Sequence, residues 1–215
     1  MTTPDPSTAR RGFALILSGP SGTGKSTVAK RVLAADPGLR FSVSCTTRAP
    51  RAGEVDGVDY HFLTPADFAA RVAAREFLEH AEVHGNYYGT LKSSVREQLD
   101  AGIDILLDID VQGADQIRAL AAGDDYWRSA ITYVFVGPPS LSELEARLRG
   151  RGTEPDDVIQ RRLANARTEL RFWRNFGRLI VNHNIDQAVA DLTALIRTER
   201  LATARLATTP PWAAP

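Results

Sequence analysis

The chain has 215 residues, of which 43% are hydrophobic and 24% charged, and its formal net charge at pH 7 is zero. This length can bury one good core with small inserted lobes, and it is too short for two large domains. The balanced charge excludes a strongly basic surface for nucleic acid, and no run of about 18 apolar residues is present to span a membrane, so we expect neither partner.

The strongest local pattern follows a loose tail predicted over residues 1–11. The apolar run 13–18 predicts a buried strand, and the residues after the loop predict a helix. Between them stands an unbroken G-x-x-x-x-G-K-[ST] loop, called the P-loop below. Its glycines let backbone N–H groups converge on anionic oxygens, and the helix N-terminus adds a positive dipole end. The predicted triphosphate-binding residues are Gly19, Pro20, Ser21, Gly22, Thr23, Gly24, Lys25, Ser26 and Thr27.

Two P-loop side chains have expected roles of their own. Lys25 would reach the β- and γ-phosphates, and the Ser26 hydroxyl would hold Mg²⁺. The sequence therefore predicts that the chain binds a nucleoside triphosphate with Mg²⁺.

Strand-like apolar runs alternate with helical patterns through the rest of the chain. The clearest further runs cover residues 103–109, 131–136 and 179–181. This alternation is typical of a parallel sheet covered by helices on both faces. The predicted fold class is therefore α/β, with three layers around a central parallel sheet.

Helix start and stop signals lie between these runs. A Thr-Pro pair supplies an N-cap and an N1 proline for a helix over 65–75, and a Ser-x-x-Glu capping box precedes a helix ending near Gly150. A long helix is predicted from near Pro155, and the last helix over about 186–200. Residues 201–215 are rich in Ala, Thr and Pro and predict a flexible tail.

Two stretches fit the alternation poorly. Residues 37–90 are rich in polar, glycine and aromatic residues, and we expect them to form an inserted lobe that binds the acceptor. Residues 147–162 carry five arginines around two glycines, and we expect a mobile lid. The core would then consist of residues 12–36 and 91–200.

The predicted lobe contains groups suited to a phosphate monoester. Arg48 and Arg51 flank a proline and form a stiff, doubly cationic turn. The phenols of Tyr60 and Tyr88 could donate hydrogen bonds to the same phosphate. The alternative is a solvated loop beside core tyrosines, because charge clusters are commonly only solvated surface.

Five motifs occur in an order and spacing that resemble those of the guanylate kinases. They are the P-loop and residues 44–54, 86–90, 107–113 and 147–153. The resemblance covers nearly everything from residue 13 to residue 200. It implies a P-loop kinase fold with an inserted GMP-binding lobe and a mobile lid. It also implies transfer of the γ-phosphoryl of ATP to GMP, and to dGMP, with Mg²⁺, in purine nucleotide metabolism and GTP supply.

The resemblance implies a role for each matching residue. Asn182 matches, with a weaker signal, a position near the adenine of ATP. The implied GMP-binding residues are Ser44, Arg48, Arg51, Glu54, Tyr60, Glu79, Tyr88, Thr90, Asp108 and Asp110. The implied catalytic residues are Lys25, Arg51, Arg147, Arg151 and Arg162.

Glu79 also has a physical case of its own. An ionised carboxylate accepts two parallel hydrogen bonds, and guanine offers N1–H and its 2-amino group side by side, whereas adenine N1 is an acceptor. A polar pocket built in this way rejects the wrong base by about 10⁴-fold. An isolated glutamate is more often a surface residue, and only the surrounding motif favours base binding.

The lid arginines and Asp108 complete the expected chemistry. Phosphoryl transfer needs positioning and neutralisation of charge on the moving group, which lid arginines supply. Arg149 and Arg161 point elsewhere by their spacing and should be solvated, and Gly150 with Gly152 would be hinges. Asp108 ends a strand-like run and could touch Mg²⁺ or position the acceptor. The sequence leaves this open and favours Ser26 as the protein ligand.

Two other functions are alternatives to this hypothesis. A non-catalytic guanylate-kinase-like interaction module typically lacks the P-loop lysine, which is present here. A P-loop kinase for another nucleoside monophosphate or a sugar phosphate would not need the acceptor motifs.

The single cysteine, Cys45, excludes an internal disulfide, and the first residues do not resemble a signal peptide, so we expect the cytoplasm. The chain could be a monomer or a homo-oligomer.

Overall fold

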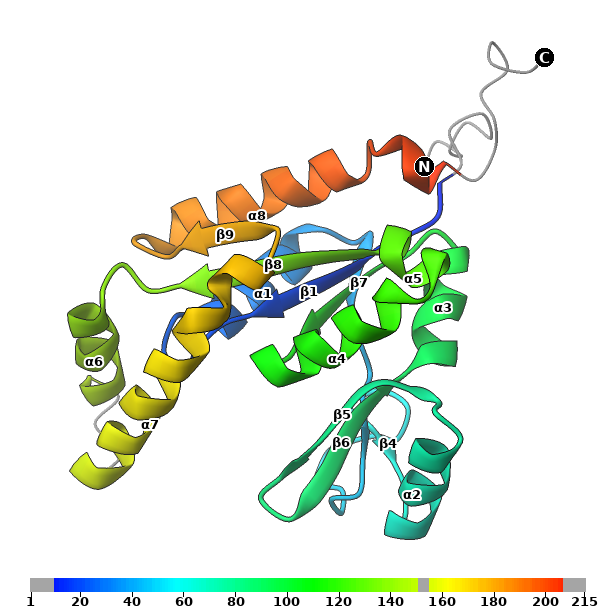
Figure 1. Ribbon diagram of the computed structural model, residues 1–215, viewed down its shortest axis with the longest axis horizontal. Coiled ribbons are helices and arrows are strands. Elements are labelled where there is room, and N and C mark those ends of the chain that lie inside the picture. Colours follow the sequence, from blue (N-terminus) through cyan, green and yellow to red (C-terminus); the bar gives the residue numbers. More distant parts are fainter. Residues whose placement is uncertain (1–9, 151–154, 207–215) are drawn as a thin grey trace.

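The computed structural model describes residues 10–150 and 155–206, and its centre is a five-stranded parallel sheet (Figure 1). The strand order is β2-β7-β1-β8-β9, and every neighbouring pair is parallel. The central strand β1 is buried along its whole length because it pairs on both edges and is covered on both faces. The strands are β1 (Ala14–Ser18), β2 (Leu39–Phe41), β7 (Asp104–Asp108), β8 (Ile131–Gly137) and β9 (Arg178–Val181).

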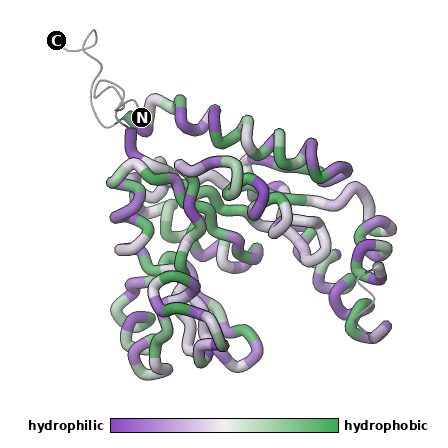
Figure 2. The backbone as a smooth tube through the Cα atoms, turned by 180° about the vertical axis from the view of Figure 1, so that it is seen from behind, coloured by the Kyte–Doolittle hydropathy of each residue, from purple (hydrophilic) through white to green (hydrophobic). Residues whose placement is uncertain are grey.

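Helices cover both faces of this sheet, which confirms the predicted three-layer α/β fold. Alternate side chains of β1 point to opposite faces, so Leu15 packs against α1 (Lys25–Ala35) and α8 (Ile185–Glu199). Ile16 packs on the other side against three helices. Figure 2 shows the amphipathic character of α8 as alternating hydrophilic and hydrophobic turns. The three helices of the second face are α3 (Lys92–Asp100), α4 (Val111–Ala122) and α5 (Asp125–Ala130).

The inserted segment forms a second, four-stranded sheet with its own small core. Its strand order is β4-β3-β6-β5, so β5 is an edge strand. Phe68 stacks on Phe77 with ring centroids 4.5 Å apart, and Cys45 completes the buried cluster. We call this unit the lobe. Its elements are β3 (Cys45–Thr46), β4 (His61–Phe62), α2 (Pro65–Ala73), β5 (Phe77–Val83) and β6 (Asn86–Leu91).

The predicted lid, residues 147–162, overlaps two helices that pack on each other through leucine, isoleucine and alanine side chains, and we call these two the lid helices. Helix α6 (Leu141–Arg149) begins with the predicted cap, since Ser140 accepts a hydrogen bond from the N–H of Glu143. Helix α7 (Asp156–Glu169) continues into a 3₁₀ turn, η2 (Leu170–Asn175). The lid helices and the lobe form separate projections of the core (Figure 1). Within the described residues, no helix is both long and apolar enough to cross a membrane.

The predicted elements are largely confirmed, with one misplaced strand. The helices expected over 65–75 and 186–200 are present as α2 and α8, and α2 has the predicted Thr64 cap. Residues 39–41 fall within the predicted lobe, 37–90, but they form β2, which pairs with β7 in the core sheet. A three-residue strand is too short to show periodicity, which explains the error.

The predicted C-terminal tail begins too early. Residues Thr203–Arg205 form a further 3₁₀ turn, η3, and Arg205 is only 4% exposed. Its guanidinium donates to the Thr132 hydroxyl at 3.0 Å and pairs with the Glu199 carboxylate at 2.5 Å. The Ala- and Pro-rich composition of this segment predicts a flexible tail, and it does not indicate the contacts of Arg205. Residues 207–215 lie outside the described residues.

The predicted N-terminal tail is also too long. Arg10 donates two hydrogen bonds, of 2.6 and 2.8 Å, to the Asp104 carboxylate, and Arg11 N–H bonds the carbonyl of Arg205. Asp104 is fully buried and also receives Arg200 Nε at 2.7 Å. The two ends of the described chain are therefore held together around one buried carboxylate.

Replacing Asp104 by alanine should lower the free energy of unfolding by about 3–5 kcal/mol, because it leaves two arginines without their shared buried partner. Urea unfolding followed by far-UV circular dichroism measures the loss. The matched control is Asp125→Ala, which removes the surface ion pair with Arg128, where Asp125 is 92% exposed. That control should change the stability by less than about 1 kcal/mol. Equal effects of both variants would contradict the structural role of Asp104.

Candidate active site

The P-loop connects β1 to α1 and has the backbone shape of an anion cradle. Gly19 and Gly24 have φ values of 143° and 87°, which favour glycine. A Cβ on Gly19 would lie 2.2 Å from the Val136 carbonyl oxygen, and one on Gly24 would lie 2.4 Å from Asn182 Nδ2. Helix α1 begins at Lys25 with no side-chain cap, so its first N–H groups remain available to an anion.

Lys25 and Ser26 both contact Asp108 at the carboxyl end of β7. Lys25 Nζ forms an ion pair with one carboxylate oxygen, and Ser26 Oγ donates to the other at 2.9 Å. The resemblance placed Asp108 with the guanine-binding residues. In the structure its carboxylate contacts the P-loop, and the residue also lines the neighbouring cavity. Asp108 therefore stands between the two predicted substrate sites.

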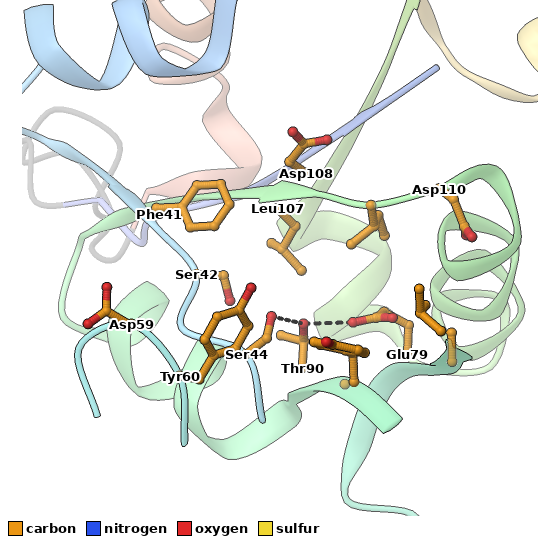
Figure 3. Close-up of a pocket in the computed structure, with 15 residues that line it drawn as sticks. Phe41, Ser42, Ser44, Asp59, Tyr60, Glu79, Thr90, Leu107, Asp108 and Asp110 are labelled. Atoms are coloured by element: carbon orange, nitrogen blue, oxygen red, sulfur yellow. Dashed lines mark hydrogen bonds between the residues drawn. The ribbon is translucent and has the colours of Figure 1, made fainter. Parts of the chain in front are cut away.

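A cavity of about 280 Å³ lies between the lobe and the core (Figure 3). Asp108 and Asp110 line it on the core side, at the end of β7 and the start of α4. The lobe contributes polar groups from the facing side. The predicted GMP-binding residues that line this cavity are Ser44, Tyr60, Glu79, Tyr88, Thr90, Asp108 and Asp110.

Glu79 is the buried carboxylate of this cavity, with 7% of its surface exposed. Thr90 Oγ1 donates to Glu79 Oε1 at 2.7 Å, and the Ser44 hydroxyl lies 3.5 Å from that of Thr90 (Figure 3). Burial raises the pKa of the Glu79 carboxyl, the Thr90 hydroxyl opposes the shift, and the charge of Asp110 adds to it. The second carboxylate oxygen of Glu79 lies beside the first turn of α4, where a Cβ on Gly113 would be 3.3 Å away.

The two arginines of the lobe turn differ in their surroundings. The Arg48 guanidinium donates to both carboxylate oxygens of Glu54, at 2.8 and 3.0 Å, and lies 5.4 Å from the centre of the Tyr60 ring. The Arg48 guanidinium and the Arg51 N–H hold the pKa of the Glu54 carboxyl below its usual range. The side chain of Arg51 is exposed. Arg48 is thus oriented beside the tyrosines, and neither arginine lines the cavity.

The lid helices rest directly on the P-loop. A Cβ on Gly22 would lie 2.9 Å from methyl groups of Leu144 and Leu148, so the α6 leucines cover that glycine. Arg147 donates to the Asn182 carbonyl at 2.9 Å, and Arg162 donates to the Ser21 hydroxyl. Two of the three predicted lid arginines therefore reach the P-loop region.

The remaining lid residues follow the helix boundaries. Arg149 pairs with Glu145 and Asp156 at the surface, as its spacing predicted. Gly150 is the C-cap of α6 with ordinary helical dihedrals (φ −65°, ψ −13°), so its predicted hinge role has no unusual backbone to support it. The predicted catalytic Arg151 and the predicted hinge Gly152 lie outside the described residues.

Asn182 is 4% exposed and follows β9. Its amide Nδ2 donates to the Thr23 carbonyl at 2.8 Å and lies against Gly24. The side chain therefore supports the P-loop backbone, and the position near adenine that the resemblance implies stays a prediction.

Comparison with known proteins shows the family of this chain. The family model described as guanylate kinase matches residues 11–199. The chain belongs to the guanylate kinase family. The guanylate kinase of Cereibacter sphaeroides is 50% identical over 193 residues, which cover 90% of this chain and 89% of that protein. That of Paramagnetospirillum magneticum is 46% identical over 201 residues, covering 94% and 91%.

A solved structure gives the same result for the fold. The crystal structure of guanylate kinase from Anaplasma phagocytophilum is 33% identical, with a TM-score of 0.68, and the match covers 92% of this chain and 91% of that one. The P-loop kinase fold predicted from the guanylate kinase motifs is confirmed.

Two residues at or beside the candidate site of this guanylate kinase family member were not predicted from the sequence. Glu169, at the end of α7, lines a pocket of about 330 Å³ together with the P-loop and Asp110. Burial and the charge of Asp110 raise the pKa of its carboxyl, against the effect of Lys25. Its seven-residue spacing from Arg162 places both on one face of α7 and could have revealed it. The second residue, Gln116 on α4, accepts a hydrogen bond from the His80 backbone N–H of the lobe.

Proposed function

We propose that this chain transfers the γ-phosphoryl group of ATP to GMP, giving ADP and GDP. The observation that carries the proposal is the position of Asp108 and Asp110. These residues lie between the anion cradle of the P-loop and the cavity that contains the buried Glu79 carboxylate. A triphosphate donor and a guanine acceptor would meet at these residues.

The donor would lie on the P-loop, with its phosphates on backbone N–H groups and on Lys25. Arg147 and Arg162 approach the loop from the lid and would neutralise charge on the transferring group, and Arg151 is assigned the same role. Closure of the lid would exclude water, so that GMP and not water accepts the phosphoryl group.

The acceptor would lie in the cavity with its guanine edge on Glu79, beside Ser44 and Thr90. Its phosphate would be held by Arg48, Arg51, Tyr60 and Tyr88. No general base is needed, because a phosphate monoester oxygen is already anionic near neutral pH, with a second pKa of about 6. These contacts use the base and the phosphate, which dGMP shares with GMP, so we propose dGMP as a second acceptor.

The residues at the P-loop fit a magnesium ion. The Ser26 hydroxyl and the Asp108 carboxylate place oxygen donors 2.9 Å apart, and oxygen is the ligand that Mg²⁺ prefers. We propose Ser26 as the protein ligand, with Asp108 as its hydrogen-bond partner. When bound, the ion would offset the negative charge of the donor phosphates.

The chain's own groups disfavour the non-catalytic module, because Lys25 and the buried Glu79 are both present. We place the enzyme in the cytoplasm, where it would supply GDP for GTP synthesis. The single cysteine of the chain suits a reducing compartment, since no second cysteine is present to form an internal disulfide.

Measurement of ADP formation from Mg·ATP with GMP, dGMP, AMP, CMP and UMP tests the function. We expect turnover with GMP and dGMP, and kcat/KM for AMP lower by about 10⁴-fold. Folded protein that does not turn over GMP would refute the proposal. Equal turnover of AMP and GMP would refute the role of Glu79 and leave the kinase function standing.

A further inference from the structure

Gln116 forms a two-bond bridge between the core and the lobe. Its Oε1 accepts a hydrogen bond from the His80 backbone N–H at 3.0 Å, and its Nε2 donates to the His80 carbonyl at 2.9 Å. Both polar ends of the side chain are thus engaged by one residue of β5. Gln116 does not line the cavity between lobe and core, so any effect on a bound nucleotide must pass through the strand.

The bridged residue directly follows Glu79. Strand β5 is at the edge of the lobe sheet, and its pairing register with β6 shifts between Phe77 and Glu79. An edge strand has one row of N–H and C=O groups that its own sheet leaves unpaired. Gln116 satisfies these groups at His80, at the end of the irregular segment that carries Glu79.

The same face of α4 contacts Glu79 itself. Asp110, Gly113 and Gln116 are three residues apart along the start of the helix, so they lie near one another on its surface. Gly113 leaves room for the second oxygen of Glu79, and Asp110 faces the cavity from the core side (Figure 3). Helix α4 therefore meets this part of β5 at two places, beside the Glu79 carboxylate and at the His80 backbone.

We propose that Gln116 is a positioning residue for guanine recognition, acting through the His80 backbone on Glu79. This inference rests on the proposed function. A displaced carboxylate cannot meet N1–H and the 2-amino group of guanine together, since two parallel hydrogen bonds need a defined orientation. Loss of the bridge should therefore weaken the reading of the 2-amino group in particular.

The test compares GMP with IMP, whose base has N1–H and lacks the 2-amino group. In Gln116→Met, which keeps the side-chain length and removes both bonds, we expect KM for GMP to rise about 10-fold. The ratio of kcat/KM for GMP to that for IMP should fall by a similar factor. KM for ATP should stay within about twofold. The control is Gln187→Met on α8, whose side-chain amide donates to Asp191 of the same helix and which should change none of these values.

A second background separates positioning from general stability. In the Glu79→Gln variant, adding Gln116→Met should produce no further fall in the GMP-to-IMP ratio, because residues that act through each other are not additive. An unchanged ratio in the single variant, or an additive fall in the double variant, would overturn the proposal. If Gln116→Met does not fold, Gln116→Glu, which keeps one acceptor and loses the donor, provides the same comparison. Absence of GMP turnover by the wild-type chain would instead refute the proposed function.

Discussion

Replacing Lys25 by alanine should lower kcat for phosphoryl transfer to GMP by about 10³-fold or more. Lys25 is the ammonium group of the P-loop at the start of α1, and in the proposed complex it would reach the phosphates of the donor. Its removal takes away a preorganised positive charge where charge accumulates during transfer. Steady-state ADP formation at saturating Mg·ATP and GMP measures the loss.

The fold should survive this change. Asp108 loses its lysine partner but keeps the hydrogen bond from Ser26 at 2.9 Å, and its side chain is 15% exposed to water. The control is Lys30→Ala, an exposed lysine on the same helix, which should retain full activity. Activity of Lys25→Ala within tenfold of the wild type would contradict the assignment. Thermal unfolding must first show that the variant is folded.

Replacing Glu79 by glutamine should lower kcat/KM for GMP by about 10³-fold and leave KM for ATP unchanged. The carboxylate would accept two hydrogen bonds from guanine, and bonds to a charged group contribute about 1.5–3 kcal/mol each. Glutamine turns one acceptor into a donor that faces a guanine donor. Initial rates with each substrate varied in turn separate the two KM values. A variant with a normal KM for GMP would exclude Glu79 from base recognition.

The same substitution should stabilise the protein without ligands at neutral pH. Burial raises the pKa of the Glu79 carboxyl, so the folded state binds this proton more tightly than the unfolded state does. The contribution of Glu79 to stability is therefore fully present below its unfolded pKa of about 4.3 and is lost as pH rises through the raised folded pKa. Glutamine is uncharged at every pH, so the variant does not lose this stability as the pH rises.

Urea unfolding of both proteins across pH 4 to 8 checks this sign. The Gln variant should gain stability relative to the wild type as pH rises, and the difference should disappear at the acid end. GMP should reverse the order, because its two donors stabilise the ionised carboxylate. A variant that is less stable than the wild type at pH 8 without ligands would show that burial of the charge is not costly here.

Much of this protein follows from short stretches of sequence. The P-loop is determined locally, because the φ values above 0° at Gly19 and Gly24 and the following helix N-terminus all lie within a few residues. The Thr64 and Ser140 caps and the strand β1 likewise depend on neighbouring residues. The predicted role of Glu79 in base binding required the order of several motifs, since one glutamate carries no local signal.

Other features depend on residues that are far apart in the chain. Lys25 and Asp108 are 83 positions apart, and they meet only because β1 and β7 are neighbouring parallel strands. The bond from Arg205 to Thr132 and the bridge from Gln116 to His80 also join distant segments, and neither has a spacing that a sequence pattern can reveal. The sequence by itself therefore determined the P-loop and the layered fold, and it predicted a set of substrate-binding residues. The tertiary structure alone decided how those residues are partnered, because side-chain contacts depend on strand order and helix packing.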